Sequence, residues 1–281
     1  MEIKTLENTP VAVIASTFNE AFSDYFIRLQ FTEESMAAKM KSEGILLRYS
    51  VGAFEGGQLV GFILNGYDML SGVKTIYNAG TGVIPSYRGK RITTSLYEYA
   101  IHMLAREGIY SHLLEVIDNN HPAMHVYEKI GFKKGRKLLA FKNDSPIQAI
   151  ASFQFKQLND IPPEAIVFSN MEAAWQNSLA SVERAKTGHQ LLGAFDNEKL
   201  VGFAAYVPTT GRVKQLAVHP HHRRKGVGTT LLQFIQQNTG ATQLVITNVD
   251  ENYEPAIMFL QALGFQVFLA LYEMKLTVER K

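Results

Sequence analysis

Two segments of the chain repeat hydrophobic residues at the spacing of an α-helix that is buried on one face. In the first segment the expected buried face is followed by a glycine: Ile92, Leu96, Tyr99, Ala100, Met103 and Leu104, then Gly108. The second segment repeats the pattern with Val227, Leu231, Phe234 and Ile235, followed by Gly240. Short apolar runs around polar turns precede both helices and are typical of strand hairpins. The pattern predicts an α/β fold, with an α+β mixed sheet in each half.

Three segments of the first half recur in the second half in the same order, which indicates a duplicated domain. GAFEGGQLVGF at 52–62 matches GAFDNEKLVGF at 193–203, VIPSYRGKRIT at 83–93 matches VHPHHRRKGVG at 218–228, and YEKIGF at 127–132 matches LQALGF at 260–265. The offset falls from 141 to 135 to 133 positions, as small loop deletions would make it. Solenoid repeats would be shorter and more numerous. We therefore expect two domains, residues 1–145 and 146–281, joined at the turn-rich stretch 143–148.

The composition excludes several classes of protein. The 281 residues carry a formal net charge of +2, with 46% hydrophobic and 19% charged residues, which is ordinary for a globular protein. This balance gives no reason to expect a nucleic-acid partner. The chain has no cysteine, so disulfides, thiolate metal sites and a cysteine nucleophile are excluded. The first residues do not resemble a secretion signal, and no apolar run reaches the length of a membrane span, so we expect a cytoplasmic protein without a membrane partner.

The stretch HPHHRRKGVG at 219–228 places three histidines and three basic residues directly before Gly-Val-Gly. It follows a predicted strand and opens a predicted helix, whose free amide N–H groups and partial positive charge attract phosphate. The glycines let a diphosphate approach the backbone, and the basic side chains add charge. The Walker and dinucleotide-binding glycine patterns are absent. A metal site would lack a carboxylate or a helical histidine pair, a nucleic-acid patch would lack interleaved aromatic residues, and a plain solvated turn stays open at this point.

The order Arg223-Arg224-Lys225-Gly226-Val227-Gly228 resembles the R-x-x-G-x-G loop with which the GNAT N-acetyltransferase superfamily holds the diphosphate of acyl-CoA. In the first half, LLEVIDNNHPAMHVYEKIGF at 113–132 resembles a later segment of the same family, matched at Asn120, Ala123, Tyr127, Gly131 and Phe132. The resemblance covers nearly the whole chain. It implies two tandem GNAT-like acyl-CoA N-acyltransferase domains with acetyl-CoA as co-substrate.

The resemblance also implies cofactor-binding residues in both halves. In the second half they are Leu216, Ala217, Val218, Arg223, Arg224, Lys225, Gly226, Val227, Gly228 and Thr229. In the first half they are Val83, Arg88, Gly89, Lys90, Arg91, Thr93 and Asn120. The first half departs from the family pattern, because Arg91 stands where glycine is expected and Thr93 stands where glycine or alanine is expected. A Cβ atom at those positions narrows the approach to the amides, and the basic side chains nearby offset this by charge.

Acetyl transfer to an amine needs a group that accepts the proton of the amine and a group that protonates the departing thiolate. In the first half the resemblance implies Glu115 as the base and Tyr127 as the acid. The second half has Asn248 and Leu260 at these positions, and neither side chain performs such a proton transfer. Catalysis there would have to rely on positioning, on water, or on another group such as Tyr253 or Glu254. No metal is expected in either half.

We therefore expect an N-acetyltransferase that moves an acetyl group from acetyl-CoA to a primary amine of a small molecule or peptide, by direct attack in a ternary complex. A non-catalytic acyl-CoA-binding regulatory protein is the alternative, and a structural protein that keeps only the fold is a third possibility. Asp24, Tyr25 and Asp68 are candidates for recognising a cationic acceptor. The duplication is compatible with a monomer or a homodimer.

Overall fold

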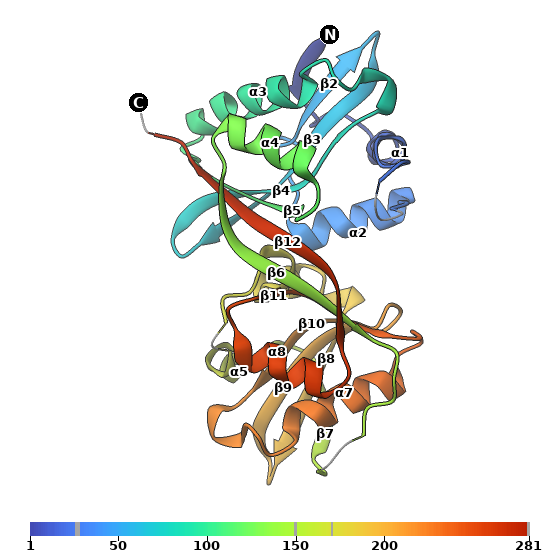
Figure 1. Ribbon diagram of the computed structural model, residues 1–281, viewed down its shortest axis with the longest axis vertical. Coiled ribbons are helices and arrows are strands. Elements are labelled where there is room, and N and C mark those ends of the chain that lie inside the picture. The colour runs from blue at the N-terminus through green and yellow to red at the C-terminus, as the bar shows by residue number, and fades with distance from the viewer. Residues whose placement is uncertain (26–28, 149–150, 170, 280–281) are drawn as a thin grey trace. The chain divides into compact units, whose positions relative to one another are not determined.

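The computed structural model describes residues 1–25, 29–148, 151–169 and 171–279. Contacts divide the chain into two compact units: unit 1 is Met1–Gly135 with Tyr272–Lys281, and unit 2 is Arg136–Leu271. In both units a strand and two helical segments precede a hairpin, and strands then alternate with helices (Figure 1). The α/β class with a mixed sheet, which the hydrophobic pattern predicted, is confirmed.

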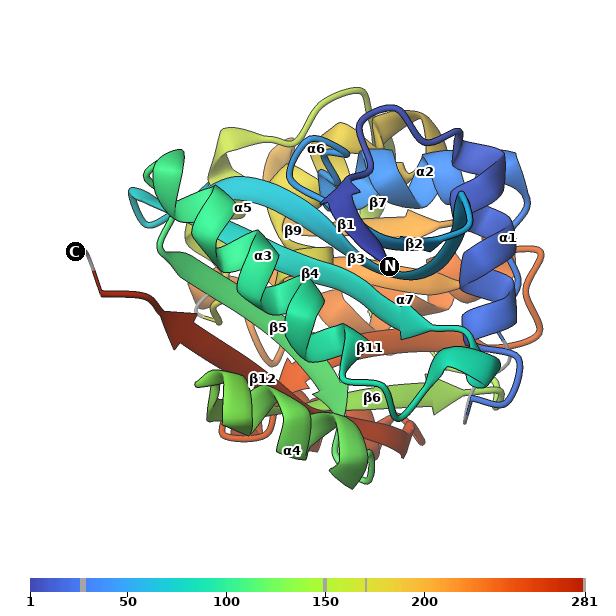
Figure 2. The same cartoon turned by 90° about the horizontal axis from the view of Figure 1, so that it is seen from above.

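Unit 1 is built on a mixed sheet with helices on both faces. Its strands follow the order β1 (Glu2–Thr5), β2 (Val51–Glu55), β3 (Gln58–Leu70), β4 (Val73–Val83) and β5 (Ser111–Ile117). Neighbouring strands are antiparallel except β4 and β5, which are parallel. The helices are α1 (Val11–Ala21), α2 (Glu33–Glu43), α3 (Ile92–Arg106) and α4 (His121–Ile130), with the 3-10 turn η1 (Pro85–Tyr87). A Cβ atom at Gly82 would touch Ala21 of α1 and one at Gly61 would touch Ile92 of α3, so α1 and α3 cover opposite faces (Figure 2).

Unit 2 repeats this arrangement. Its strands follow the order β11 (Leu244–Asp250), β10 (Arg212–Val218), β9 (Lys199–Val207), β8 (Gln190–Asp196) and β7 (Gln154–Leu158), and only β10 and β11 are parallel. The helices are α5 (Pro163–Phe168), α6 (Leu179–Arg184), α7 (Val227–Asn238) and α8 (Glu254–Ala262). The 3-10 turns are η2 (Trp175–Asn177), η3 (Lys186–Gly188) and η4 (Pro220–His222). Helix α7 packs in the larger core of the unit, whereas α6 packs in a smaller core with Leu191 and Phe203. Because Leu191 and Leu192 belong to different cores and adjacent strand residues point to opposite faces, α6 and α7 lie on opposite faces of the sheet.

Two strands, β6 (Lys133–Asn143) and β12 (Gln266–Thr277), contain residues of both units. The part of β6 from Arg136 onward belongs to unit 2, where the strand pairs with β11, and the part of β12 from Tyr272 onward belongs to unit 1. This grouping differs from the division at residues 145 and 146 that the sequence duplication suggests. The reason is that a sequence repeat records order along the chain, whereas a compact unit is defined by which strands pair.

The helix expected after residue 91 forms, but its buried face includes Tyr97, which the pattern did not predict, and leaves out Tyr99. Ile92, Leu96, Ala100 and Leu104 are buried, whereas Tyr99 is 39% exposed, so its assignment to the core was wrong. The buried row follows the i, i+4 spacing, and Tyr99 lies off this row. Among the helices of the described residues, none has the length and apolar character that crossing a membrane requires.

Candidate functional site

A cleft opens in unit 2 where the parallel strands β10 and β11 diverge. In the described chain the two strands pair only at Arg212↔Val245 and Val213↔Ile246. Asn248, two residues further along β11, has a φ of 61° and lies where the register between β11 and β6 shifts. A residue in this conformation bends its strand, so β11 turns away from β10 beyond the paired residues. The edge of β10 that follows Val213 therefore faces the cleft.

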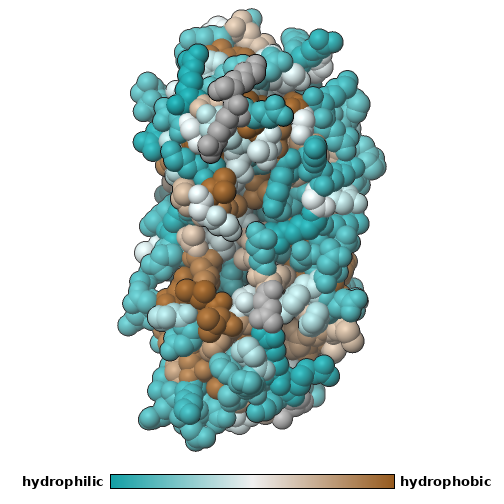
Figure 3. All heavy atoms as spheres, turned by 90° about the vertical axis from the view of Figure 1, so that its left-hand side faces the viewer, coloured by the Kyte–Doolittle hydropathy of each residue, from teal (hydrophilic) through white to brown (hydrophobic). Residues whose placement is uncertain are grey.

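The cleft holds a cavity of about 660 Å³, a volume suited to a small-molecule ligand. It is lined by residues of β10 and β11, by the loop before α7, by α7 and α8, and by the segment between α5 and η2. Met258 of α8 lines it and is 67% exposed, so apolar surface continues from the cavity to the outside. Figure 3 views the side on which Figure 1 draws α5 and α8, and it shows brown apolar surface there. A ligand in this cavity would cover that surface.

The mouth of the cavity is the loop between β10 and α7. Arg224 has a φ of 63°, and Gly226, the residue before α7, has a φ of 87°, so the chain turns twice through the left-handed region before the helix begins. This turn leaves the first amide N–H groups of α7 without helical partners at the cavity wall. Gly226, Val227, Gly228 and Thr229 all line the cavity. The loop therefore has the geometry of an anion site at a helix N-terminus.

The expected cofactor residues of the second half are not equivalent in the structure. Leu216, Val218, Arg223 and Arg224 also line the cavity, whereas Ala217 and Lys225 are not among the residues that line it. Ala217 lies between Leu216 and Val218 on β10 and points to the opposite face of the strand, where it is buried.

Arg223 anchors the loop to the rest of unit 2. Its Nε donates to the carbonyl oxygen of Val218 at 3.2 Å, and its Nη2 donates to that of Phe168 at 2.9 Å. These bonds direct its guanidinium group to backbone carbonyls and fix the loop where it leaves β10. Gly228 serves packing as well, because a Cβ atom there would lie 3.0 Å from the ring of Phe259.

The three histidines of the stretch 219–228 lie in and beside the 3-10 turn η4. His219 contacts the ring of Phe168 edge-on at 5.2 Å, and its own ring lies 5.4 Å from that of His221. His222 lines the cavity and lies 3.8 Å from a carboxylate oxygen of Asp196. Across the part of the chain that the structure describes, no group of three or more potential ligands is placed to hold a metal ion.

The corresponding loop of unit 1 has the same backbone with different side chains. Gly89 has a φ of 78° and Arg91 a φ of 58°, which match the left-handed residues Arg224 and Gly226. Arg88 repeats the anchoring of Arg223, since its Nε donates to the carbonyl oxygen of Val83 at 3.2 Å.

Arg88 also donates to both carboxylate oxygens of Asp24, at 2.6 and 2.8 Å, and this hydrogen bonding lowers the pKa of Asp24. Lys90 lies over the ring of Tyr87 at 4.7 Å, and Thr93 is half-buried in the first turn of α3.

Tyr127, the expected acid of the first half, is buried in a cluster of polar and aromatic side chains. Its hydroxyl lies near Thr81 and Asn78, and its ring lies 5.9 Å from those of Tyr97 and Phe132. Asn78 Nδ2 also donates to Thr81 Oγ1 at 2.8 Å and to the hydroxyl of Tyr97 at 2.5 Å. Burial raises the pKa of Tyr127 to about 12. The hydroxyl is therefore held inside the protein by its own neighbours.

The other candidates of unit 1 also have protein partners. Asn120 caps α4 by accepting from the amide of Ala123 at 3.3 Å, and its Nδ2 lies 3.4 Å from the hydroxyl of Tyr25. Asp68 accepts from the amide of Met69 at 2.8 Å. Glu115 is half-buried on β5. The structure thus brings Tyr25, Asn120 and Tyr127 together, whereas Asp24 is engaged by Arg88.

The two units differ most in the residues that fill the cleft. The polar cluster of unit 1 is replaced position by position by aliphatic side chains in unit 2. Asn78, Thr81, Tyr97 and Tyr127 correspond to Val213, Leu216, Leu232 and Leu260. Leu232 is buried, and the other three aliphatic residues line the cavity. Unit 2 therefore has smaller leucine side chains where unit 1 has the phenol rings of Tyr97 and Tyr127.

Several residues that line the cavity carry no signal in the sequence. Asn177 of η2, Lys214 and Gln215 of β10 and Thr247 of β11 belong to no recognisable motif, and only the fold brings them to one wall. Tyr253 and Glu254 also line the cavity, at the start of α8, as the sequence had suggested for a replacement of the missing pair.

Family models match both halves of the chain. Residues 12–132 match the acetyltransferase (GNAT) family, and residues 187–267 match an acetyltransferase (GNAT) domain. A comparison with curated proteins gives no match.

Solved structures with the same fold span both units. A tandem GNAT protein from the clavulanic acid biosynthesis pathway is 16% identical, with a TM-score of 0.75 over 100% of this chain and 99% of that one. A putative acetyltransferase from Pyrococcus horikoshii is 15% identical, with a TM-score of 0.69 over 99% of this chain and 89% of that one. A GCN5-related N-acetyltransferase from Sphaerobacter thermophilus is 13% identical, with a TM-score of 0.70 over 98% and 95%. At these identities the likeness establishes the fold alone.

Proposed function

The chain belongs to the GNAT acetyltransferase family, with a domain of that family in each half, and on this premise we propose that it transfers an acetyl group from acetyl-CoA to a primary amine. The observation that carries the proposal is the cavity of about 660 Å³ in unit 2, which runs from the start of α7 into the cleft between β10 and β11. We assign acetyl-CoA to this cavity.

The residues of unit 2 fit such a co-substrate. The amides of Gly226 to Thr229 and the side chain of Arg224 face the mouth, where a diphosphate would bind. The cleft-facing edge of β10 between Val218 and Lys214 would pair with the amides of the pantetheine arm, as a neighbouring strand would. The four residue steps from Val218 to Lys214 span roughly 13 Å, so the thioester would lie at the closed end of the cleft when the diphosphate lies at the mouth.

The chemistry needs little beyond placement. The neutral amine nitrogen attacks the carbonyl carbon of the thioester, the new C–N bond forms, and the C–S bond breaks. The nitrogen loses a proton, the departing sulfur gains one, and the products are an acetamide and free CoA. Tyr253 and Glu254 line this cavity beyond the carboxyl end of β11, and we propose that water between them and the thioester carries the protons.

We place the reaction in unit 2 because the cavity of about 660 Å³ lies there, whereas unit 1 has the larger phenol rings of Tyr97 and Tyr127 at the positions of Leu232 and Leu260. Tyr127 is 9% exposed and Tyr97 is 3% exposed, and the hydroxyl of Tyr97 already has a partner. A phenol with a pKa of about 12 is also a weaker acid than an ordinary tyrosine. In this proposal unit 1 keeps the fold and the loop, and its role is structural.

Two measurements on the purified protein test the proposal. Titration calorimetry with acetyl-CoA should show one bound molecule per chain, and CoA thiol should be released when a panel of small and peptide amines is added. Tight binding without thiol release would favour an acyl-CoA-binding regulatory protein. Flat titrations for both CoA and acetyl-CoA would refute the assignment of this cavity.

A further inference from the structure

Asn177, the last residue of η2, bridges the two diverging strands at the closed end of the cleft. Its Nδ2 donates to the backbone carbonyl of Thr247 on β11 at 2.6 Å, and its own carbonyl accepts from the Nε2 of Gln215 on β10. The strands last pair at Val213 and Ile246, so Asn177 lies directly beyond the point where they separate. It therefore lies beside the inner part of the cavity, which it lines.

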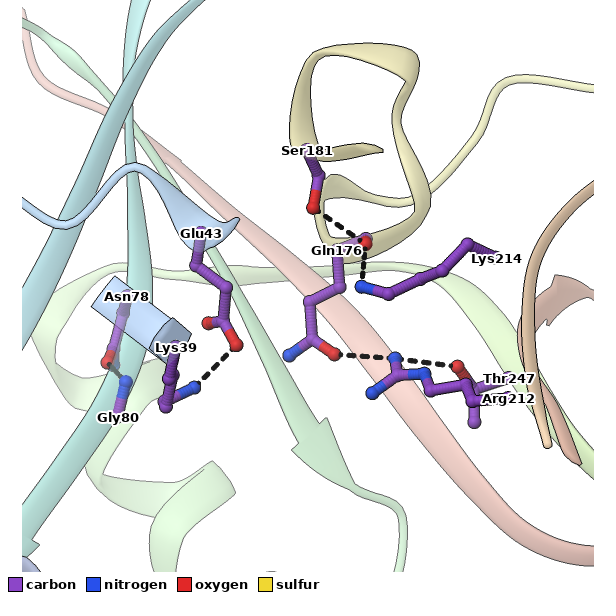
Figure 4. Close-up of polar contacts among 9 residues, drawn as sticks. All are labelled: Lys39, Glu43, Asn78, Gly80, Gln176, Ser181, Arg212, Lys214 and Thr247. Atoms are coloured by element: carbon purple, nitrogen blue, oxygen red, sulfur yellow. Dashed lines mark hydrogen bonds and ion pairs between the residues drawn. The ribbon is translucent and has the colours of Figure 1, made fainter. Parts of the chain in front are cut away.

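The turn that carries Asn177 is held rigidly. The preceding residue, Gln176, accepts from Lys214 Nζ at 2.6 Å and from Ser181 Oγ at 3.0 Å through its backbone carbonyl (Figure 4). Its side-chain oxygen accepts from Arg212 Nη2 at 3.0 Å, and the same nitrogen donates to Thr247 Oγ1 at 2.9 Å (Figure 4). A side chain supported in this way is fixed before a ligand arrives.

The side-chain oxygen of Asn177 is buried and has no hydrogen-bond partner among the residues that the structure describes, and the residue is only 6% exposed. The amide orientation follows from chemistry, because the group that faces the carbonyl of Thr247 must be the NH₂ donor. Oδ1 is then an acceptor without a donor. Buried acceptors are nearly always satisfied in proteins, so an unsatisfied one beside a cavity indicates a missing donor.

The position of Asn177 distinguishes the two substrates. The mouth for the diphosphate lies at α7, whereas η2 leads directly into α6, which covers the opposite face of the sheet. Lys214 and Gln215 line the same cavity, and their side chains donate to the backbone carbonyls of Gln176 and Asn177. An acceptor that approaches the thioester from the η2 side therefore meets Oδ1 as a fixed polar atom.

We propose that Asn177 Oδ1 accepts a hydrogen bond from an N–H group of the acceptor amine and so positions its nitrogen for attack. When the amine donates one N–H to Oδ1, the lone pair on its nitrogen points away from Oδ1. The nitrogen is then free to attack the carbonyl carbon of the thioester. Asn177 is thus a positioning and specificity residue that selects acceptors with an N–H to donate. The inference rests on the proposed function, because it assumes that the thioester lies in this cleft.

A pair of CoA analogues tests this without knowledge of the natural acceptor. In the first, the CoA sulfur is joined through CH₂–C(=O) to the nitrogen of ethylamine, so that an N–H stands where the acceptor nitrogen would be. In the second, that nitrogen carries a methyl group in place of hydrogen. We expect the parent protein to bind the N–H analogue about tenfold more tightly in calorimetry, and Asn177→Leu to bind both alike.

Two further variants separate recognition from folding. Asn177→Asp keeps an oxygen acceptor but loses the donor to the carbonyl of Thr247, so it should lower stability while keeping the preference for the N–H analogue. Asn143→Leu removes a buried asparagine that donates to the carbonyl of Leu263 at 2.8 Å, away from the cavity, and it should lower stability while keeping the preference.

Equal binding of both analogues by the parent, or a preference that persists in Asn177→Leu, would overturn the inference. If neither analogue nor CoA itself binds the parent protein, the proposed function fails instead. The two failures are therefore distinguishable.

Discussion

Replacing Gly226 by aspartate should weaken acetyl-CoA binding mainly through charge. Gly226 has a φ of 87° and lines the mouth of the cavity directly before α7. At a separation of about 5 Å and an effective dielectric constant of about 40, one pair of like charges costs about 1.7 kcal/mol. A diphosphate carries two such charges, and salt screens part of the repulsion, so we expect a loss of about 2 kcal/mol, or roughly 30-fold in Kd.

The matched variant is Gly226→Asn, which has the same shape and tolerates the left-handed backbone as well as aspartate does. Each substitution should lower the stability of the fold by about 1 kcal/mol, so the difference between the two reports charge alone. Arg91→Asp places the same charge at the equivalent left-handed residue of unit 1 and tests location.

Calorimetry with acetyl-CoA at low and high salt is the assay. The gap between Gly226→Asp and Gly226→Asn should narrow as salt is added, and Arg91→Asp should change Kd less than twofold. The reasoning is refuted if aspartate and asparagine at residue 226 weaken binding equally, or if Arg91→Asp weakens it as much as Gly226→Asp.

Three further predictions concern unit 1. Tyr127→Phe should leave kcat within twofold but lower the free energy of unfolding by about 1–2 kcal/mol, because it removes a buried hydroxyl from the polar side chains of Asn78 and Thr81. A tenfold fall in kcat would place catalysis in unit 1. Burial lowers the pKa of His112 to about 4 in the folded protein, whereas its ordinary value, which applies to the unfolded chain, is 6.5. Between these two values the unfolded chain binds more protons than the folded protein, so the stability of the fold falls as the pH is lowered from about 6.5 to 4. The loss between pH 7.5 and 5 should be about 2 kcal/mol in urea unfolding and should shrink in His112→Asn; an equal loss in both proteins would contradict this. Thr32 accepts from the amide of Ser35 at 3.2 Å in a capping box, so Thr32→Ala should lower the stability of the fold by about 1 kcal/mol in thermal unfolding, and an unchanged Tm would show that the cap contributes little.

The duplication, the mixed fold and the loop before α7 could be read from the sequence, because each depends on short-range pattern. Alternation of strand and helix follows from the spacing of apolar residues, and a glycine-rich turn before a helix follows from backbone freedom at a few positions. The same backbone even forms in unit 1, where arginine replaces glycine at residue 91. Tyr99 shows the limit of such patterns, since helical spacing gave it a buried place that the fold does not provide.

Only the tertiary structure showed the cavity between β10 and β11. The sequence favoured Tyr127 as a catalytic acid because its position in a motif is visible, but its burial depends on Tyr97 and Asn78, which come from other elements. The wall that includes Asn177 is assembled from η2, β10 and β11, which are far apart along the chain. A cavity is the space that such separate elements leave unfilled, and the order of residues along a single chain does not record that space.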